Sequence, residues 1–206
     1  MTSEEIKEPK DIMLDIETFG NTSNALVVQV AMQYFNRNTA QLGASLYVNI
    51  NVEESMKKGF EINEETLAFW EQQPKEVFDS LQVNPLSCED AAHQIKKFIE
   101  FGSKIWCHAT FDAPIMGNFF NKLDIKLPWG YKNVRDIRTL VELSGLDLEK
   151  YNWEEGKTHN ALDDVHFQIK YCVDALNMIK FKCTQDQAIE VRQKIELMES
   201  GTTISE

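Results

Sequence analysis

The sequence predicts an α/β fold in which a mixed β-sheet, with three antiparallel strands first and parallel strands after them, is flanked by helices. The first 50 residues hold three β-rich runs, whereas short apolar runs alternate with amphipathic stretches after about residue 85. The length of 206 residues suits one domain with its own core. We therefore expect a single domain over residues 10–197, with frayed ends at 1–9 and 198–206.

The strand signals begin at residue 11. Over residues 11–17 apolar side chains occupy every second position, which predicts a strand that sends Ile12, Leu14 and Ile16 into the core. The runs 25–35 and 42–50 are rich in β-forming residues and would continue an antiparallel meander.

The rest of the chain reads as helices separated by short strands. The segment 53–81 is helical and mixed, and short strands are expected at 103–109 and 133–135. Helices are predicted at 89–101, 112–123, 136–144, 160–180 and 185–199. Asp112 would be the N-cap of its helix, with Pro114 in the first turn.

Charge and composition limit the function. The net charge of −12 argues against a protein that coats nucleic acid, but it leaves room for an enzyme that holds a few terminal nucleotides. The polar N-terminus does not resemble a signal peptide, and no apolar run approaches the roughly 18 residues of a membrane span, so no membrane partner is expected. Four cysteines show no close pairing in the sequence: Cys88, Cys107, Cys172 and Cys183. We therefore expect reduced thiols and a cytoplasmic protein.

Acidic residues form the chemically informative pattern. Asp15 and Glu17 lie two residues apart on a predicted strand, so their carboxylates leave the same face and repel unless a divalent cation compensates them. A solvated strand edge is the alternative. Asp112 follows a predicted strand, where a simple N-cap is the alternative, and Asp164 lies early in a helix that His159 precedes.

Three motifs follow one another over residues 11–175: Asp-x-Glu, Phe-Asp and His-x-Ala-x-x-Asp. Their order and spacing resemble those of the DEDDh 3′→5′ exonucleases, a DnaQ-like family with an RNase H-like fold. The sequences of segments 66–70 and 133–139 resemble those of the exonuclease A group of tailed phages and its bacterial exoribonuclease relatives. If the protein is phage-encoded, the expected location is the host cytoplasm. One departure is that many proofreading subunits have His-Asn-Ala where this chain has Cys107-His108-Ala109.

The resemblance implies roles for these residues. Asp15, Glu17, Asp112 and Asp164 would hold two ions, Mg²⁺ or alternatively Mn²⁺, and His159 would be the general base; the spacing selects Asp164 over Asp163. Single-stranded DNA 3′ ends are the first expected substrate and RNA 3′ ends the second, while a homodimer is compatible with the sequence. A catalytically silent protein-binding relative and a metal-regulated structural protein are the other interpretations.

Substrate contacts are expected near the first acidic pair, at Thr18, Phe19, Gly20, Trp70 and Phe111. A turn at Gly20 and core packing of Trp70 are the alternatives to nucleotide contact. The sequence favours core or turn packing for Trp106 and Trp129, and structural or exposed roles for the histidines His93, His108 and His166. It favours salt bridges rather than phosphate contacts for Arg135 and Arg138.

Overall fold

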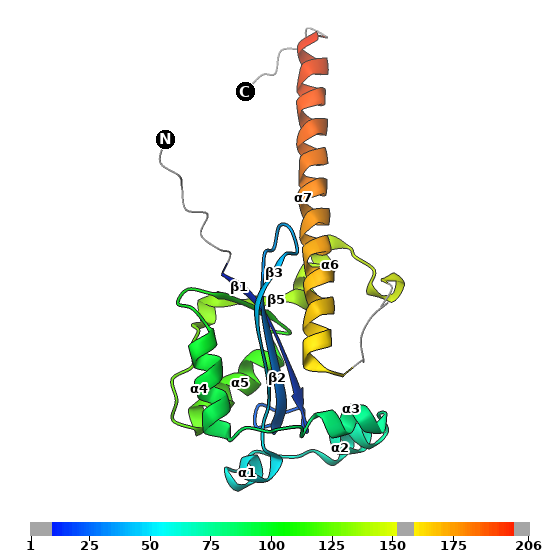
Figure 1. Cartoon of the computed structure of the whole chain (residues 1–206). Coiled ribbons are helices and arrows are strands. Elements are labelled where there is room, and N and C mark those ends of the chain that lie inside the picture. The colour runs from blue at the N-terminus through cyan, green and yellow to red at the C-terminus, as the bar shows by residue number, and fades with distance from the viewer. Residues whose placement is uncertain (1–9, 152–158, 200–206) are drawn as a thin grey trace.

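The computed structural model describes residues 10–151 and 159–199 and contains a five-stranded sheet in the order β3-β2-β1-β4-β5 (Figure 1). The first three strands are antiparallel, and β4 and β5 run parallel to β1, which confirms the predicted mixed sheet. The strands are β1 (Asp11–Thr18), β2 (Val27–Phe35), β3 (Leu42–Asn49), β4 (Lys104–Cys107) and β5 (Val134–Asp136).

Helices cover both faces of this sheet. α4 (Cys88–Phe98) and α5 (Asp112–Lys122) pack on one face, and α6 (Ile137–Ser144) and α7 (Ala161–Glu199) lie on the other (Figure 1). Three short helices cross one end of the sheet between β3 and α4: α1 (Val52–Lys57), α2 (Glu64–Glu71) and α3 (Lys75–Ser80). The 3₁₀ turns η1 (Tyr131–Asn133) and η2 (Leu148–Lys150) flank β5 and α6.

The central strand β1 is buried on both faces. Ile12, Leu14 and Ile16 belong to the core under α4 and α5, as the alternation predicted. Met13 and Asp15 point to the opposite face, which is also buried because α7 packs across it. The alternative of a solvated strand edge is therefore wrong, because Asp11 and Asp15 are buried and Glu17 is half-buried.

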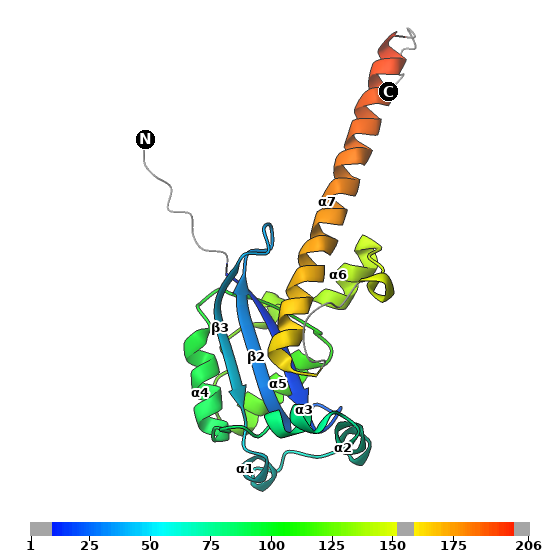
Figure 2. The ribbon, with the colours of Figure 1, turned by 45° about the vertical axis from the view of Figure 1, so that its right-hand side comes forward.

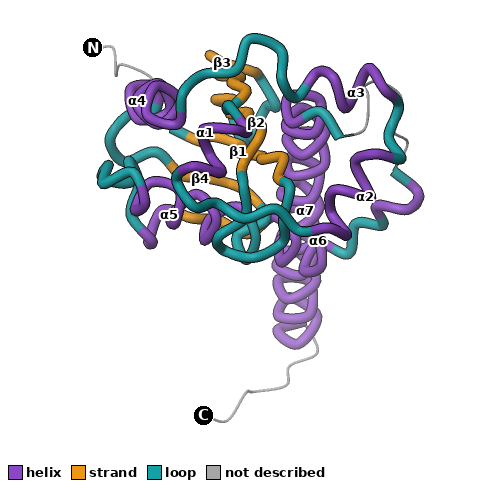
Figure 3. The backbone as a smooth tube through the Cα atoms, turned by 90° about the horizontal axis from the view of Figure 1, so that it is seen from below, coloured by secondary structure: helices purple, strands orange, loops and turns teal. Residues whose placement is uncertain are grey.

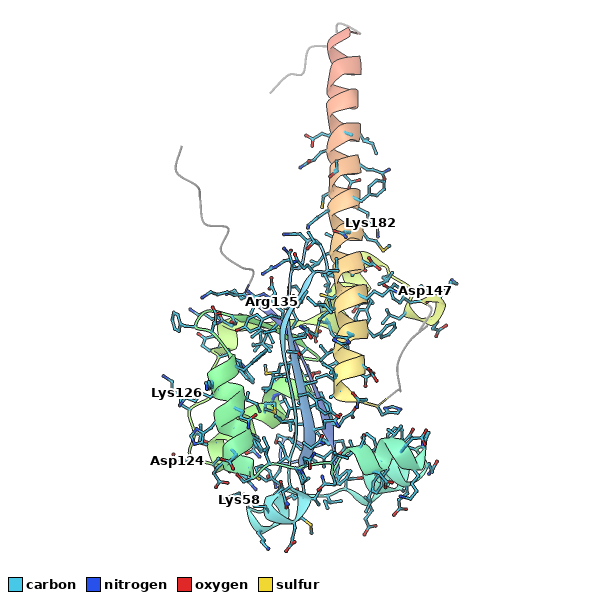
Figure 4. The ribbon with its side chains drawn as sticks, in the orientation of Figure 1. Lys58, Asp124, Lys126, Arg135, Asp147 and Lys182 are labelled. Atoms are coloured by element: carbon cyan, nitrogen blue, oxygen red, sulfur yellow. The ribbon has the colours of Figure 1, made fainter. Side chains whose placement is uncertain are left out.

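α7 is one continuous helix rather than the two helices predicted at 160–180 and 185–199. Neither glycine nor proline interrupts the sequence between Lys180 and Gln185, so nothing stops the helix. The Lys182 ammonium donates a 2.6 Å hydrogen bond to the Ser144 carbonyl. Lys182 lies on α7 near the point where the helix leaves the domain (Figure 4), and residues 181–190 are exposed where the helix extends beyond it (Figure 2).

The expected frayed N-terminus at 1–9 lies outside the described residues, and the expected frayed segment 198–206 overlaps them only in the last two residues of α7. All four cysteines are free thiols, as predicted. Within 10–151 and 159–199, none of the helices is long and apolar enough to cross a membrane.

Candidate active site

The predicted acidic residues meet at the C-terminal end of β1. Asp15 and Glu17 come from β1, Asp112 is the first residue of α5, and Asp164 lies in the first turn of α7. The possible ligand atoms of Asp15, Glu17 and Asp164 lie within 4.8 Å of one another, and so do those of Asp15, Asp112 and His108. Asp15 therefore belongs to two neighbouring triads, and the four carboxylates form one cluster.

Asp112 is oriented by the loop that follows β4. Its Oδ2 accepts a 2.7 Å hydrogen bond from the backbone N–H of His108. The predicted N-cap role is wrong, since Phe111 holds the cap position and Asp112 begins α5 itself. Asp136 fixes the same loop by accepting a 3.0 Å hydrogen bond from the backbone N–H of Ala109.

Residues of β2 and β3 fix the start of α7, and so the position of Asp164. Gln29 on β2 accepts a 2.8 Å hydrogen bond from the backbone N–H of Ala161. The Asn160 side chain donates to the Tyr47 hydroxyl at 3.1 Å, and its Oδ1 caps the helix by accepting from the backbone of Leu162. The first turn of α7 is thereby tied to the sheet.

Gln168 is the polar side chain on the buried stripe of α7 that reaches the cluster. Its Nε2 donates a 2.6 Å hydrogen bond to Asp15 Oδ1, while its own Oε1 is buried without a partner in the described part of the chain. Burial and the carboxylates of Asp112, Glu17 and Asp164 together raise the pKa of Asp15 well above its usual range, against the lowering effect of Gln168.

The other three carboxylates of the cluster also have raised pKa values. Burial raises the pKa of Asp112 to about 8 and that of Asp164 to about 6. Burial and the neighbouring Asp164 raise the pKa of Glu17. No ion pair joins any of the four to a lysine or arginine among the residues described. Carboxylate oxygens that are gathered in one place without an ion-pair partner fit hard divalent cations, so the donor set suits Mg²⁺ or Mn²⁺.

His159 lies beside the cluster, immediately before α7. Its backbone takes the left-handed conformation with φ of 66°. Its backbone N–H donates a hydrogen bond to the Asp164 carboxylate, which lowers the pKa of that carboxyl group against the effect of burial. The imidazole meets the ring of Phe69 edge-on at 4.9 Å between centroids. Burial lowers the pKa of His159, so the ring is neutral at pH 7 and able to accept a proton.

Trp70 does not offer a stacking surface for a base. Its side chain is 2% exposed, and its Nε1 donates a 2.9 Å hydrogen bond to the Thr18 carbonyl. The alternative of core packing is therefore correct. The neighbouring residue Phe69 is 41% exposed and lies against His159, where α2 approaches the start of α7 (Figure 3).

The other expected substrate contacts have internal partners. Thr18 is buried and donates to the Gly20 carbonyl at 2.6 Å, and Phe19 is buried against Phe78. A Cβ on Gly20 would meet Ala25 Cβ at 3.1 Å, so close packing explains this glycine. Phe111 is partly buried against the core. Contact with a nucleotide at these four positions stays a prediction.

The structure differs from the sequence-based expectations at His108 and at the two arginines Arg135 and Arg138. His108, expected to be structural or exposed, lies in the triad with Asp15 and Asp112, and burial lowers its pKa to about 4. The signal was present in the motif, where a histidine replaces the asparagine of the resembled family. Arg138 is exposed and acts electrostatically on His108 and Asp112, and the salt bridges predicted for Arg138 and Arg135 are not found among the described residues.

A mixed sheet in this order, with carboxylates gathered from β1, α5 and α7, defines the RNase H-like DEDDh class. Residues 10–176 match the model of the 3′-5′ exoribonuclease Rv2179c-like domain, and the chain belongs to that family. The predicted resemblance to DnaQ-like exonucleases is confirmed, while the link to phages stays a prediction. No curated protein matches the chain.

Solved structures share the fold. E. coli exonuclease I in complex with a dT13 oligonucleotide is 16% identical with a TM-score of 0.59, over 92% of this chain and 45% of that chain. Its zinc-bound complex with single-stranded DNA is 17% identical with a TM-score of 0.60, over 92% and 44%. The nuclease domain of 3′hExo, a DEDDh family member bound to rAMP, is 10% identical with a TM-score of 0.53, over 81% and 91%. This chain thus spans less than half of exonuclease I.

Proposed function

We propose that the protein is a 3′→5′ exonuclease that removes nucleoside 5′-monophosphates one at a time from single-stranded 3′ ends. The observation that carries this proposal is the pair of triads that share Asp15, because a shared carboxylate allows two ions to lie close enough together to act on one phosphate. Family membership supports the same reaction.

The residues have distinct tasks. Glu17 and Asp164 would hold one ion, Asp112 the other, and Asp15 both. When bound, the two ions supply an activated water and stabilise charge on the phosphate and the leaving oxygen. His159 takes the proton of the attacking water, a task that its neutral ring can perform at pH 7.

Substrate capture depends on few contacts. The exposed ring of Phe69 beside His159 offers a face on which the terminal base can stack, and exposed Arg138 offers a cation for phosphate. Figure 4 shows Lys126 on the α4 and α5 side of the sheet, the side opposite α7. The net charge of −12 suits an enzyme that contacts few phosphates at the end of a strand. Because salt dependence grows with the number of phosphate contacts, the affinity for the oligonucleotide should fall only shallowly as salt rises.

DNA is the first substrate that the sequence favours, and RNA is the second candidate because the matched family is one of exoribonucleases. The test is digestion of labelled DNA and RNA oligonucleotides of equal sequence with Mg²⁺ or Mn²⁺. We expect release of mononucleotides from an unblocked 3′ end, protection by a 3′-phosphate, and no product with Asp164→Asn.

Two results would contradict the proposal. Cleavage of a covalently closed single-stranded circle would reveal an endonuclease, since a circle has no end. Uptake of metal without release of any nucleotide would favour the protein-binding or structural alternatives.

A further inference from the structure

His108 directly follows β4, the strand that pairs in parallel with the strand carrying Asp15. β4 pairs with β1 so that Trp106 is opposite Met13. Asp15 follows Met13 by two residues within β1, so their side chains share a face. His108 follows Trp106 by two residues but is the first residue of the loop after β4, so the pairing brings the start of this loop beside the strand that carries Asp15.

Distances agree with this placement. The ligand atoms of Asp15, His108 and Asp112 lie within 4.8 Å of one another. Ligands held at roughly 2.1 Å from one ion lie up to about 4.2 Å apart, so a small inward movement completes the set. Asp112 is already fixed by the backbone of His108, and no hydrogen bond among the described residues occupies the His108 ring.

We propose that His108 is a metal ligand in the ion site formed with Asp15 and Asp112, and that its nitrogen makes this site prefer Mn²⁺ and other first-row transition ions to Mg²⁺. This inference rests on the proposed function, since it adds a protein ligand to one of the two ion sites assigned there.

The physical reason is the donor type. Mg²⁺ binds oxygen and keeps much of its water, whereas imidazole nitrogen suits transition ions. The other triad, Asp15, Glu17 and Asp164, offers oxygen alone and has no such preference. The two sites would thus differ in selectivity although they share a carboxylate.

The test is pulsed electron paramagnetic resonance of the whole protein loaded with Mn²⁺, which detects nitrogen bound to the ion without any turnover. We expect a histidine nitrogen coupling in the wild type that persists in His159→Ala and disappears in His108→Asn. Isotopic labelling of histidine with ¹⁵N should change the coupling, a readout that does not depend on how well a variant folds.

Competition between the ions gives the magnitude. We expect His108→Asn to lower Mn²⁺ affinity by about tenfold or more and to change Mg²⁺ affinity much less. A wild-type spectrum without nitrogen coupling would overturn the role of His108 while leaving the nuclease proposal intact. A coupling lost in His159→Ala instead would overturn the role of His108 and also the role of His159 as general base. Failure to bind Mn²⁺ at all would overturn both.

Discussion

Asp11 and Asp15 lie on the same face of β1, and both are buried, at 2% and 8% exposure. Asp11 accepts two 2.7 Å hydrogen bonds from the Arg37 guanidinium and a 2.8 Å hydrogen bond from Trp106 Nε1. Asp15 has one neutral donor, Gln168, and three acidic neighbours. One strand thus carries a compensated aspartate at its start and an uncompensated one near its end.

The presence or absence of a positively charged partner distinguishes a buried carboxylate with a structural role from one with a functional role. A buried carboxylate costs several kcal/mol unless it is paired, so a fold keeps an unpaired cluster only where something else neutralises it. Arg37 is that partner for Asp11. For the cluster of Asp15, Glu17, Asp112 and Asp164, we assign the role to divalent cations.

The largest effect is expected from Asp15→Asn, which removes the carboxylate shared by both triads. The turnover rate should fall by on the order of 10⁴ or more, the scale of a central catalytic group. Without metal the variant should melt at the same temperature as the wild type or higher, because repulsion is relieved. Initial rates on a labelled oligonucleotide and calorimetric melting measure the two quantities. A fully active variant would end the two-ion account.

His159→Ala should come next, with a loss of roughly 10² to 10⁴ in turnover, the usual range for a general base. Because His159 lies outside both triads, metal affinity measured by titration calorimetry should change little. If metal binding collapses instead, the residue is a ligand and its assigned role is wrong.

Arg37→Met tests the other end of the strand. Leaving Asp11 buried without its partner should lower the free energy of unfolding by about 3 kcal/mol, measured by urea denaturation. Turnover of the folded enzyme should stay unchanged, since the pair lies away from the cluster. A loss of turnover comparable to that of Asp15→Asn would erase the distinction between the two aspartates.

Much of this comparison could be predicted from the sequence, because it depends on local spacing. Alternation over residues 11–17 placed Asp15 and Glu17 together, and the order of motifs supplied Asp112, His159 and Asp164. The mixed sheet followed from three early strands and the alternation after them. These features depend on neighbours along the chain or on a motif.

The rest depends on contacts between distant segments. Arg37 meets Asp11 and Gln168 meets Asp15 only after folding, across 26 and 153 residues of sequence. A polar residue within the apolar stripe of α7 was the one hint for Gln168. His108 was marked only by its place in the motif, and folding is what brings the loop after β4 within reach of Asp15 and Asp112.

A smaller effect is expected from pH on the metal-free protein. The pKa of Asp112 is raised to about 8 in the folded state, from about 3.9 when unfolded, so its contribution to stability is complete at low pH and is lost as pH rises through 8. Between pH 6.5 and 8.5 the loss should be about 2 kcal/mol, or roughly 6 °C in Tm.

The window avoids His108, whose pKa of about 4 leaves its folded ring neutral throughout. Asp112→Asn is the matched variant and should show a flatter profile. Equal slopes for the two proteins would show that Asp112 does not titrate as its burial implies.

The most direct test of the central claim is the change in Tm produced by Mn²⁺ at pH 7.5, compared between wild type, Asp15→Asn and Arg37→Met. At about one hundred times the dissociation constant, bound metal should stabilise the wild type by about 2.7 kcal/mol, or roughly 8 °C. Arg37→Met, although less stable, should gain the same increment, and Asp15→Asn should gain only a small part of it. An equal gain in Asp15→Asn, or none in the wild type, would contradict the account of a cation-compensated cluster.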